Sequence, residues 1–155
     1  MKKGLNPVSM QLTCAVRAPL PGDYDKMADL AGQLGYECTG TEIRNRLDQM
    51  CDPHQYAIYV AELPGGRIAG WVSVYIFRAV VFDGFAEING LVVDQQIRSR
   101  GIGSVLLDVA ERWARSHGCS AISVRSNVTR ERAHRFYACK GYEHVKTQKS
   151  FRKSL

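Results

Sequence analysis

Residues 92–104 read VVDQQIRSRGIGS, and the change of pattern inside this stretch decides the fold. Apolar residues run up to Val93, a polar turn follows, and from Gly103 the apolar residues recur every three or four positions. This order predicts a strand, a turn and an amphipathic helix. The backbone N–H groups that open such a helix have no acceptor within it, and the helix dipole adds positive charge. The stretch therefore predicts an anion-binding site.

The spacing of the turn is Arg-x-x-Gly-x-Gly, formed by Arg98, Gly101 and Gly103. The glycines let a phosphate approach the main chain, and Arg98 and Arg100 add charge. A Walker loop is excluded because no Lys follows the second Gly, and a dinucleotide fingerprint is excluded because Leu106 stands where a small residue is needed. The alternative is a Gly-rich turn with solvated arginines.

The composition fits one globular domain over residues 1–155, with residues 1–10 as a loose tail, because 45% of the 155 residues are apolar. Charge is uneven: residues 1–97 carry 8 basic and 11 acidic side chains, whereas residues 98–155 carry 13 and 4. The basic half favours an anionic partner such as a phosphorylated cofactor, nucleic acid or membrane phosphate. The acidic half favours a cationic second partner.

The five cysteines are odd in number and form no C-x-x-C. This argues against a disulfide framework and against zinc, and favours free thiols in the cytoplasm. No signal peptide is expected, because polar residues interrupt the first stretch. The most apolar stretch, residues 68–82, contains Ser73 and Arg78 and is too short to span a bilayer. We therefore expect no membrane partner and no metal.

Apolar periodicity and turn residues predict the remaining elements. Helices are expected over residues 23–34, 41–52, 103–118 and 129–139. Strands are expected over residues 13–17, 56–63, 68–81, 85–93 and 121–125, with two weak closing strands over 143–147 and 150–155. This order predicts an α/β fold with a mixed central sheet of six to seven strands and about four helices. Gly90 inside a strand suggests a bulge.

The turn motif and its surroundings resemble the GNAT-type N-acetyltransferases, a family that binds acetyl-CoA. Arg98, Gly101 and Gly103 match the family's Gln/Arg-x-x-Gly-x-Gly/Ala motif. The flanking segments GLVVD, GIGSVLLDVAERWARSHG and SNVTRERAHRFYACKGYE are also typical. The resemblance covers Thr13 to Leu155 and is strongest over Glu87–Tyr142. One feature departs from it, because Gln95 stands where a Pro often follows the Asp.

The resemblance implies how the cofactor acetyl-CoA binds. The sheet would splay between residues 85–93 and 121–125, and pantetheine would insert there and bond the backbone amides of Leu91, Val92 and Val93. The pyrophosphate would lie on the turn formed by Arg98, Ser99, Arg100, Gly101, Ile102, Gly103 and Ser104. Asn127 would bond the pantetheine amides. The alternatives are a plain buried strand at residues 91–93 and a turn or cap residue at Asn127.

The resemblance also implies the catalytic residues. Tyr137 would be the general acid that protonates the CoA sulfur, and the alternative is a packed aromatic side chain beside Phe136. Glu87 would be the base that deprotonates the amine, and the alternative is a solvated residue or a structural ion pair. Strand alternation predicts Glu87, Asn89 and Leu91 on one face. His134, three residues before Tyr137, is a further candidate beside an ordinary surface role.

We expect an N-acetyltransferase that moves an acetyl group from acetyl-CoA to a primary amine by direct attack in a ternary complex. The first two helices and the hairpin loops would form the acceptor site. Their acidic side chains favour a small cationic amine or a protein amine; they are Asp23, Asp25, Asp29, Glu37, Glu42, Asp48 and Asp52. Tyr24, Tyr36 and Tyr56 would supply walls. The alternatives are a CoA-binding protein without catalysis and a basic nucleic-acid-binding module, and a homodimer stays open.

Overall fold

The computed structural model describes residues 13–155. The tail predicted at residues 1–10 lies outside them. The chain forms two compact units, the first ending at Val124 and the second spanning Arg125–Leu155, and each is described by itself. The expectation of one domain over the whole chain stays a prediction.

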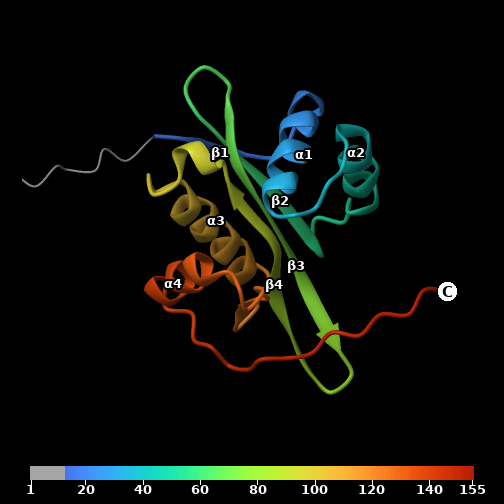
Figure 1. The fold of residues 1–155 in the computed structure, drawn as a ribbon. Helices are drawn as coiled ribbons and strands as arrows, with labels where there is room; N and C mark the ends of the chain where they lie inside the picture. Colours follow the sequence, from blue (N-terminus) through green and yellow to red (C-terminus); the bar gives the residue numbers. More distant parts are fainter. Residues whose placement is uncertain (1–12) are drawn as a thin grey trace, which may run out of the picture. The chain divides into compact units, whose positions relative to one another are not determined.

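The first unit is built on a five-stranded sheet with the order β1-β2-β3-β4-β5 (Figure 1). Its strands are β1 (Ala15–Arg17), β2 (Tyr56–Glu62), β3 (Ile68–Ala79), β4 (Phe82–Val93) and β5 (Ile122–Val124). Neighbouring strands are antiparallel except for β4 and β5, which are parallel. The mixed α/β sheet is confirmed.

Helices cover both faces of this sheet, with α1 and α2 on one side and α3 on the other (Figure 1). Their bounds are α1 (Tyr24–Gln33), α2 (Gly40–Gln49) and α3 (Ile102–Ser116), with the 3-10 turns η1 (Pro21–Asp23) and η2 (Gln95–Ile97). The second unit holds α4 (Glu131–Cys139). The predicted start of α2 at Thr41 is one residue late, because Thr39 is the N-cap residue and forms a reciprocal capping box with Glu42.

The predicted count of six to seven strands is wrong for the described residues, which form five. The expected closing strands over 143–147 and 150–155 are irregular and exposed. Three of these residues are Lys or Arg, and the apolar Val145, Phe151 and Leu155 are exposed. The segments therefore lack the half-buried face that stabilises a strand.

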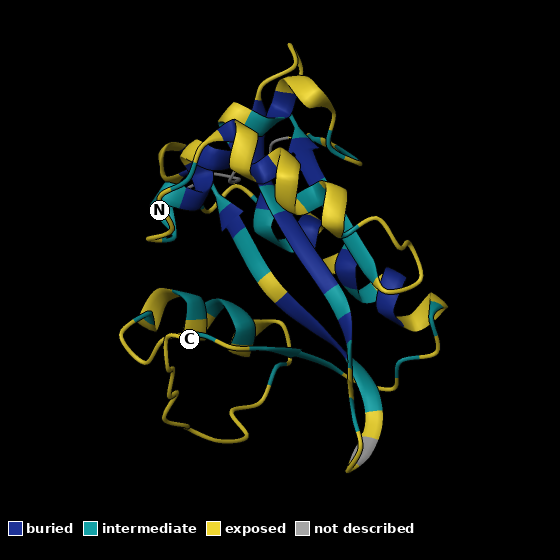
Figure 2. Cartoon of the chain, turned by 90° about the vertical axis from the view of Figure 1, so that its right-hand side faces the viewer, coloured by how far each residue is buried: buried dark blue, intermediate teal, exposed yellow. Residues whose placement is uncertain are grey.

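The core of the first unit lies along β3 and β4, whose inner positions are buried (Figure 2). Leu106, Leu107 and Val72 are fully buried on the α3 side, where a Cβ on Gly70 would come within 3.2 Å of Leu106. On the α1 side, Leu30 and Met27 are buried at helical spacing. Each fully buried aliphatic side chain contributes about 1.5–3 kcal/mol.

A β-bulge divides β4 into two segments. Ser73 of β3 lies opposite Gly90, whereas the next residue, Val74, lies opposite Ile88. Asn89 is therefore the extra residue. This confirms the irregularity predicted from Gly90.

Two further findings concern the cysteines and the helices. All five cysteines are free thiols. Within residues 13–155, no helix is long and apolar enough to cross a membrane.

Gly90 has no room for a side chain. A Cβ there would lie 2.5 Å from Cζ3 of the Trp71 ring. We therefore expect Gly90→Ala to lower the free energy of unfolding by about 1–3 kcal/mol, as over-packing does. Urea unfolding measures it. Gly32→Ala in α1 is the control, since a Cβ there meets nothing closer than 3.6 Å and helix propensity favours Ala. Equal stability of Gly90→Ala and the unaltered protein would contradict the tight contact.

Candidate active site

β4 has an open edge beside the point where β5 stops. β5 pairs with β4 only from Ala86 to Ile88, while β4 continues to Val93. Among residues 13–155, no further strand pairs with β4 on this side. Beyond Ile88, this edge of β4 is therefore not paired with any strand of the described residues.

The register of β4 decides which backbone groups face this edge. The Asp94 N–H donates to the Ala69 carbonyl of β3 at 2.8 Å. Since backbone groups alternate along a strand, the N–H of Val92 also points toward β3, and those of Leu91 and Val93 point to the open edge. Val92 is moreover 2% exposed. The predicted set of three amides is thus reduced to Leu91 and Val93.

The bulge corrects the predicted face of Glu87. Glu87 lies opposite Tyr75, Gly90 opposite Ser73, and Leu91 opposite Val72. Because β3 alternates without interruption, Glu87 and Gly90 share the face of Tyr75 and Ser73, and Leu91 lies on the other. The prediction that Glu87, Asn89 and Leu91 share one face is wrong, because Asn89 adds one residue between them.

Glu87 lies among aromatic side chains. Its carboxyl group accepts a hydrogen bond from the Tyr75 hydroxyl at 3.0 Å, and the residue is 6% exposed. The Tyr75 ring stacks on Tyr56 at 6.2 Å. The sequence reasoning missed Tyr75, because only the β3–β4 register brings it opposite Glu87. A buried carboxylate beside rings can bind an ammonium group or take its proton.

The turn after β4 brings backbone N–H groups to the start of α3. Gly101 is the N-cap residue of α3 and adopts φ 87°, which a side chain would oppose. Ser99 also has a positive φ of 63°. The helix begins directly afterwards at Ile102, one residue before the predicted start at Gly103, so the first N–H groups of this 15-residue helix lie within the glycine motif.

The two arginines of the turn differ in role. The Arg98 side chain donates from Nε to the Val93 carbonyl at 3.0 Å, so it ties the turn back to the end of β4. Arg100 is exposed. Arg100 is therefore the more accessible cation for an anionic ligand.

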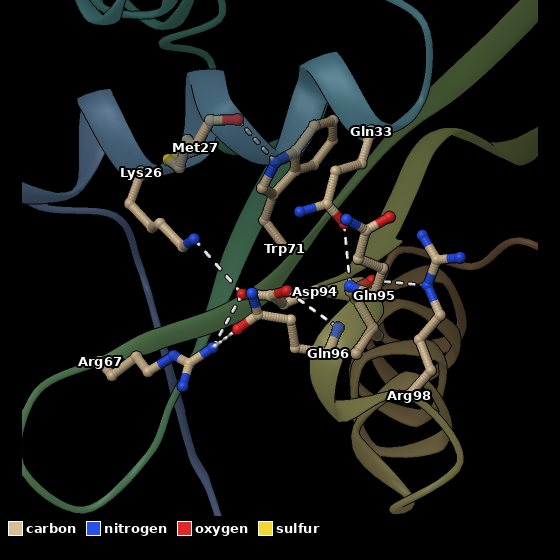
Figure 3. A network of polar contacts seen from close by, with 10 residues as sticks. Lys26, Met27, Gln33, Arg67, Trp71, Asp94, Gln95, Gln96 and Arg98 are labelled. Carbon is tan, nitrogen blue, oxygen red and sulfur yellow. Dashed lines mark hydrogen bonds and ion pairs between the residues drawn. The ribbon is translucent and has the colours of Figure 1, made fainter.

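Asp94 is the centre of a polar network behind the turn (Figure 3). Its Oδ2 lies 3.3 Å from Lys26 Nζ and 3.0 Å from Arg67 Nη2, and its Oδ1 accepts from the Gln96 N–H at 3.1 Å. Burial alone raises the pKa of Asp94, but these hydrogen bonds and charges outweigh it and lower the pKa to about 2. Sequence reasoning used Asp94 only as part of the flanking motif.

In the second unit, the Asn127 side chain holds a turn that precedes α4. Its Oδ1 accepts from the Thr129 N–H at 3.0 Å and from the Thr129 hydroxyl at 2.9 Å. His134 Nε2 lies 3.0 Å from the Asn127 carbonyl oxygen. The side-chain oxygen of Asn127 therefore has the role of a turn residue, which is the alternative considered for Asn127. Helix α4 begins at Glu131, two residues after the predicted cap.

Tyr137 lies in an aromatic group of the same unit. Its ring centroid is 5.3 Å from Phe136 and 5.5 Å from Tyr142. Burial raises the pKa of Tyr137 to about 12, although Arg130 opposes this. The phenol therefore stays protonated over the whole physiological range.

Three of the acidic residues predicted for an acceptor wall have structural roles. Asp23 is buried, pairs with Arg17 at 2.6 Å and accepts from the Leu20 N–H, and the Arg17 bonds hold the pKa of Asp23 below its usual value. Glu42 caps α2. Asp48 lies 3.8 Å from Arg44. Asp23 is therefore unavailable to an acceptor, whereas Glu42 and Asp48 remain exposed.

The model of the acetyltransferase (GNAT) family matches residues 25–142. The chain belongs to this family. It is 35% identical over 141 residues to the aminoalkylphosphonate N-acetyltransferase of Salmonella typhimurium, covering 84% of this chain and 85% of that protein. It is 28% identical over 102 residues to an aminoglycoside N(6')-acetyltransferase type 1 of Klebsiella aerogenes, covering 64% and 67% of the two chains.

Solved structures of GNAT proteins share the fold. The chain matches an aminoglycoside antibiotic 6'-N-acetyltransferase of Acinetobacter baumannii with a TM-score of 0.79 at 14% identity, over 92% of this chain and 99% of that one. It matches glucosamine-6-phosphate N-acetyltransferase of Arabidopsis thaliana with a TM-score of 0.77 at 22% identity, over 92% and 99%. The expected fold and acyltransferase class are thus confirmed. Residues 13–155 contain no group of three His, Cys, Asp or Glu arranged to hold a metal ion.

The Asp94 network makes stability depend on pH. A carboxyl group whose pKa is lower in the folded state stabilises the fold above its unfolded pKa, and this stabilisation is lost as the pH falls through the folded pKa. We expect Asp94→Asn to cost about 2 kcal/mol at pH 7 and progressively less between pH 5 and 2. Urea unfolding across this range measures the difference.

The control is Asp108→Asn, at an exposed position of α3. It should change stability by less than about 0.5 kcal/mol at every pH. A pH-independent loss in Asp94→Asn would contradict the role given to the ion pairs.

Proposed function

We propose that the chain catalyses transfer of an acetyl group from acetyl-CoA to a primary amine, by direct attack within a ternary complex. The observation that carries this proposal is the open edge of β4, which leads directly into the glycine turn and the N-terminus of α3. An extended amide chain with a diphosphate at one end fits such an arrangement. Membership of the GNAT family supports the same reaction.

The residues of the first unit fit this cofactor. The N–H groups of Leu91 and Val93 would pair with the amides of pantetheine as a neighbouring strand does. The segment Arg98–Ser104 would hold the diphosphate, with backbone N–H groups at the helix start and the charge of Arg100. When bound, the thioester supplies the activated acetyl group. One β4 N–H at the edge would stabilise the oxygen as it becomes negative.

Glu87 is proposed to receive the amine. Its carboxyl group is held by the Tyr75 hydroxyl on the face that also carries Gly90. An ammonium group placed there would be bound by charge and by the ring faces. Glu87 would then accept its proton, directly or through water, before attack. Proximity of the two substrates would supply much of the rate.

Tyr137 is proposed to assist the leaving sulfur as a hydrogen-bond donor. Since its pKa is raised to about 12 and that of an ordinary thiol is about 8.5, complete proton transfer to a thiolate is uphill. A phenol that always keeps its proton can nevertheless donate a hydrogen bond to the developing thiolate. We therefore narrow the role of Tyr137 from acid to donor. Asn127 stays a candidate for the pantetheine amides through its NH₂ group.

The acceptor is proposed to be a small cationic amine, with a protein amine as the second candidate. Relatives named for aminoalkylphosphonate and aminoglycoside substrates support a small molecule. The strand face near Glu87 offers one carboxylate and the rings of Tyr56, Tyr75 and Trp71. The free cysteines support the proposed cytoplasmic location.

Binding of acetyl-CoA should stabilise the fold. At 100 times Kd a ligand of the native state adds about 2.7 kcal/mol, which raises Tm by several degrees. We expect Arg100→Glu to weaken binding by about tenfold to hundredfold, because a charge that meets phosphate is reversed. Titration calorimetry at two salt concentrations measures it.

The matched control is Arg112→Glu, also exposed and ten residues into α3. Since a helix rises 1.5 Å per residue, it lies far from the helix start and should leave the affinity for acetyl-CoA unchanged. Equal affinities of the two variants would remove the turn from the binding site. A shift of Tm with DNA or RNA but none with CoA would favour the nucleic-acid alternative instead.

Catalysis is tested by release of free CoA with a panel of amines that includes aminoalkylphosphonates and aminoglycosides. We expect turnover with at least one amine, and we expect Tyr137→Phe to lower kcat by about 10-fold to 1,000-fold with little change in the affinity for CoA. Phe136→Leu is the control for packing in the same aromatic group. Binding of CoA without turnover for any amine would favour the catalytically silent alternative.

A further inference from the structure

We propose that helix α1 is a clamp that holds the diphosphate-binding turn in shape, with Lys26 in its first turn and Gln33 at its C-terminal end as positioning residues. This inference rests on the proposed function of the turn. The Gln33 side-chain oxygen accepts a hydrogen bond from the Gln95 N–H at 2.9 Å, across 62 residues of chain (Figure 3). Gln95 is the first residue of η2, which leads from β4 into the turn. The last residue of α1 thus holds the first N–H of the turn.

A second contact from α1 holds the residue before it. Lys26 Nζ lies 3.3 Å from the Asp94 carboxylate, which also binds Arg67 of the β2–β3 turn. The same carboxylate caps η2 through the Gln96 N–H, and Asp94 is 3% exposed. Two successive N–H groups, those of Gln95 and Gln96, are therefore fixed by groups that are themselves anchored to α1. Figure 3 shows these side chains converging on the entrance to the turn.

The clamp matters for binding because the turn is polar and exposed beyond Ile97. Ser99 and Arg100 are exposed, and Ser99 adopts a positive φ. A turn that must be ordered by its ligand binds more weakly than one that is already ordered. We expect the loss of the exposed hydrogen bond from Gln95 to Gln33 to weaken CoA binding by about threefold to tenfold.

The backbone at Gln95 permits a decisive comparison with proline. Asp94 has a ψ of 124°, which lies outside the α region that a following proline disfavours. Proline is also favoured at the first position of a helix, where its fixed φ is already suitable. Gln95→Pro would remove the N–H that donates to Gln33, but the proline ring would fix φ of residue 95. The proline ring at position 95 and the Gln33 hydrogen bond would thus each fix the backbone of residue 95. With the proline ring in place, the Gln33 contact is no longer needed.

The experiment is a double-mutant cycle on the full chain with Gln33→Leu, Gln95→Pro and the double variant. CoA affinity is measured by titration calorimetry, with KM and kcat for acetyl-CoA where turnover is found. We expect Gln33→Leu alone to weaken CoA binding about threefold to tenfold and to raise KM with kcat unchanged. In the Gln95→Pro background the same change should have no effect. Gln49→Leu, at the equivalent last residue of α2, is the matched control and should bind CoA normally.

Amide hydrogen exchange of residues 96–104 supplies a readout that needs no ligand. Gln33→Leu should speed amide exchange in this segment. Addition of Gln95→Pro to Gln33→Leu should restore the protection. An equal loss of CoA affinity in both backgrounds, or unchanged exchange in Gln33→Leu, overturns the clamp. If the unaltered protein binds no CoA but exchange follows the expected pattern, the clamp on the turn stands and the proposed function fails.

Discussion

The extra residue in β4 is the constraint on which the rest of the first unit depends. By adding Asn89 between two regular segments, the bulge puts Glu87 on the face of Tyr75 and keeps Leu91 and Val93 with their N–H groups toward the open edge. Gly90 makes this arrangement possible, because the Trp71 ring occupies the space of its side chain. Trp71 is in turn held by the Met27 carbonyl of α1 at 3.2 Å. The bulge in β4 thus determines the positions of the Glu87 carboxylate and of the edge N–H groups, and through Trp71 it is linked to α1.

The strand, turn and helix around residues 92–104 could be predicted because their signals are local. The switch of apolar period and the two glycines lie within 13 consecutive residues, and the structure places Gly101 in the left-handed conformation at the start of α3. The faces of β4 could not be predicted in the same way. Alternation was correct on each side of Asn89, but which residue is extra is decided by pairing with β3, a contact between distant segments.

The charged residues show the same limit. Sequence reasoning treated Asp23 as part of an acceptor wall and Arg98 as a phosphate ligand, yet Asp23 is buried against Arg17 and Arg98 bonds the Val93 carbonyl. Their partners lie on other elements or across a turn, so the spacing of residues in the sequence does not predict these contacts. Asp94 is the opposite case, because an ordinary motif residue becomes the point where α1, the β2–β3 turn and η2 meet. The prediction of the two closing strands is wrong for a different reason, because residues 143–155 are all exposed.

The open edge of β4 also bears on how such a sequence can diverge. The groups that it offers are peptide N–H groups, which every amino acid except proline supplies. Leu91 and Val93 are therefore constrained by packing and not by chemistry, and other apolar residues of similar shape would serve the edge equally well. Relatives could exchange these side chains for others of similar shape and keep the same N–H groups at the edge, so that residue identity there carries little record of the role of the edge.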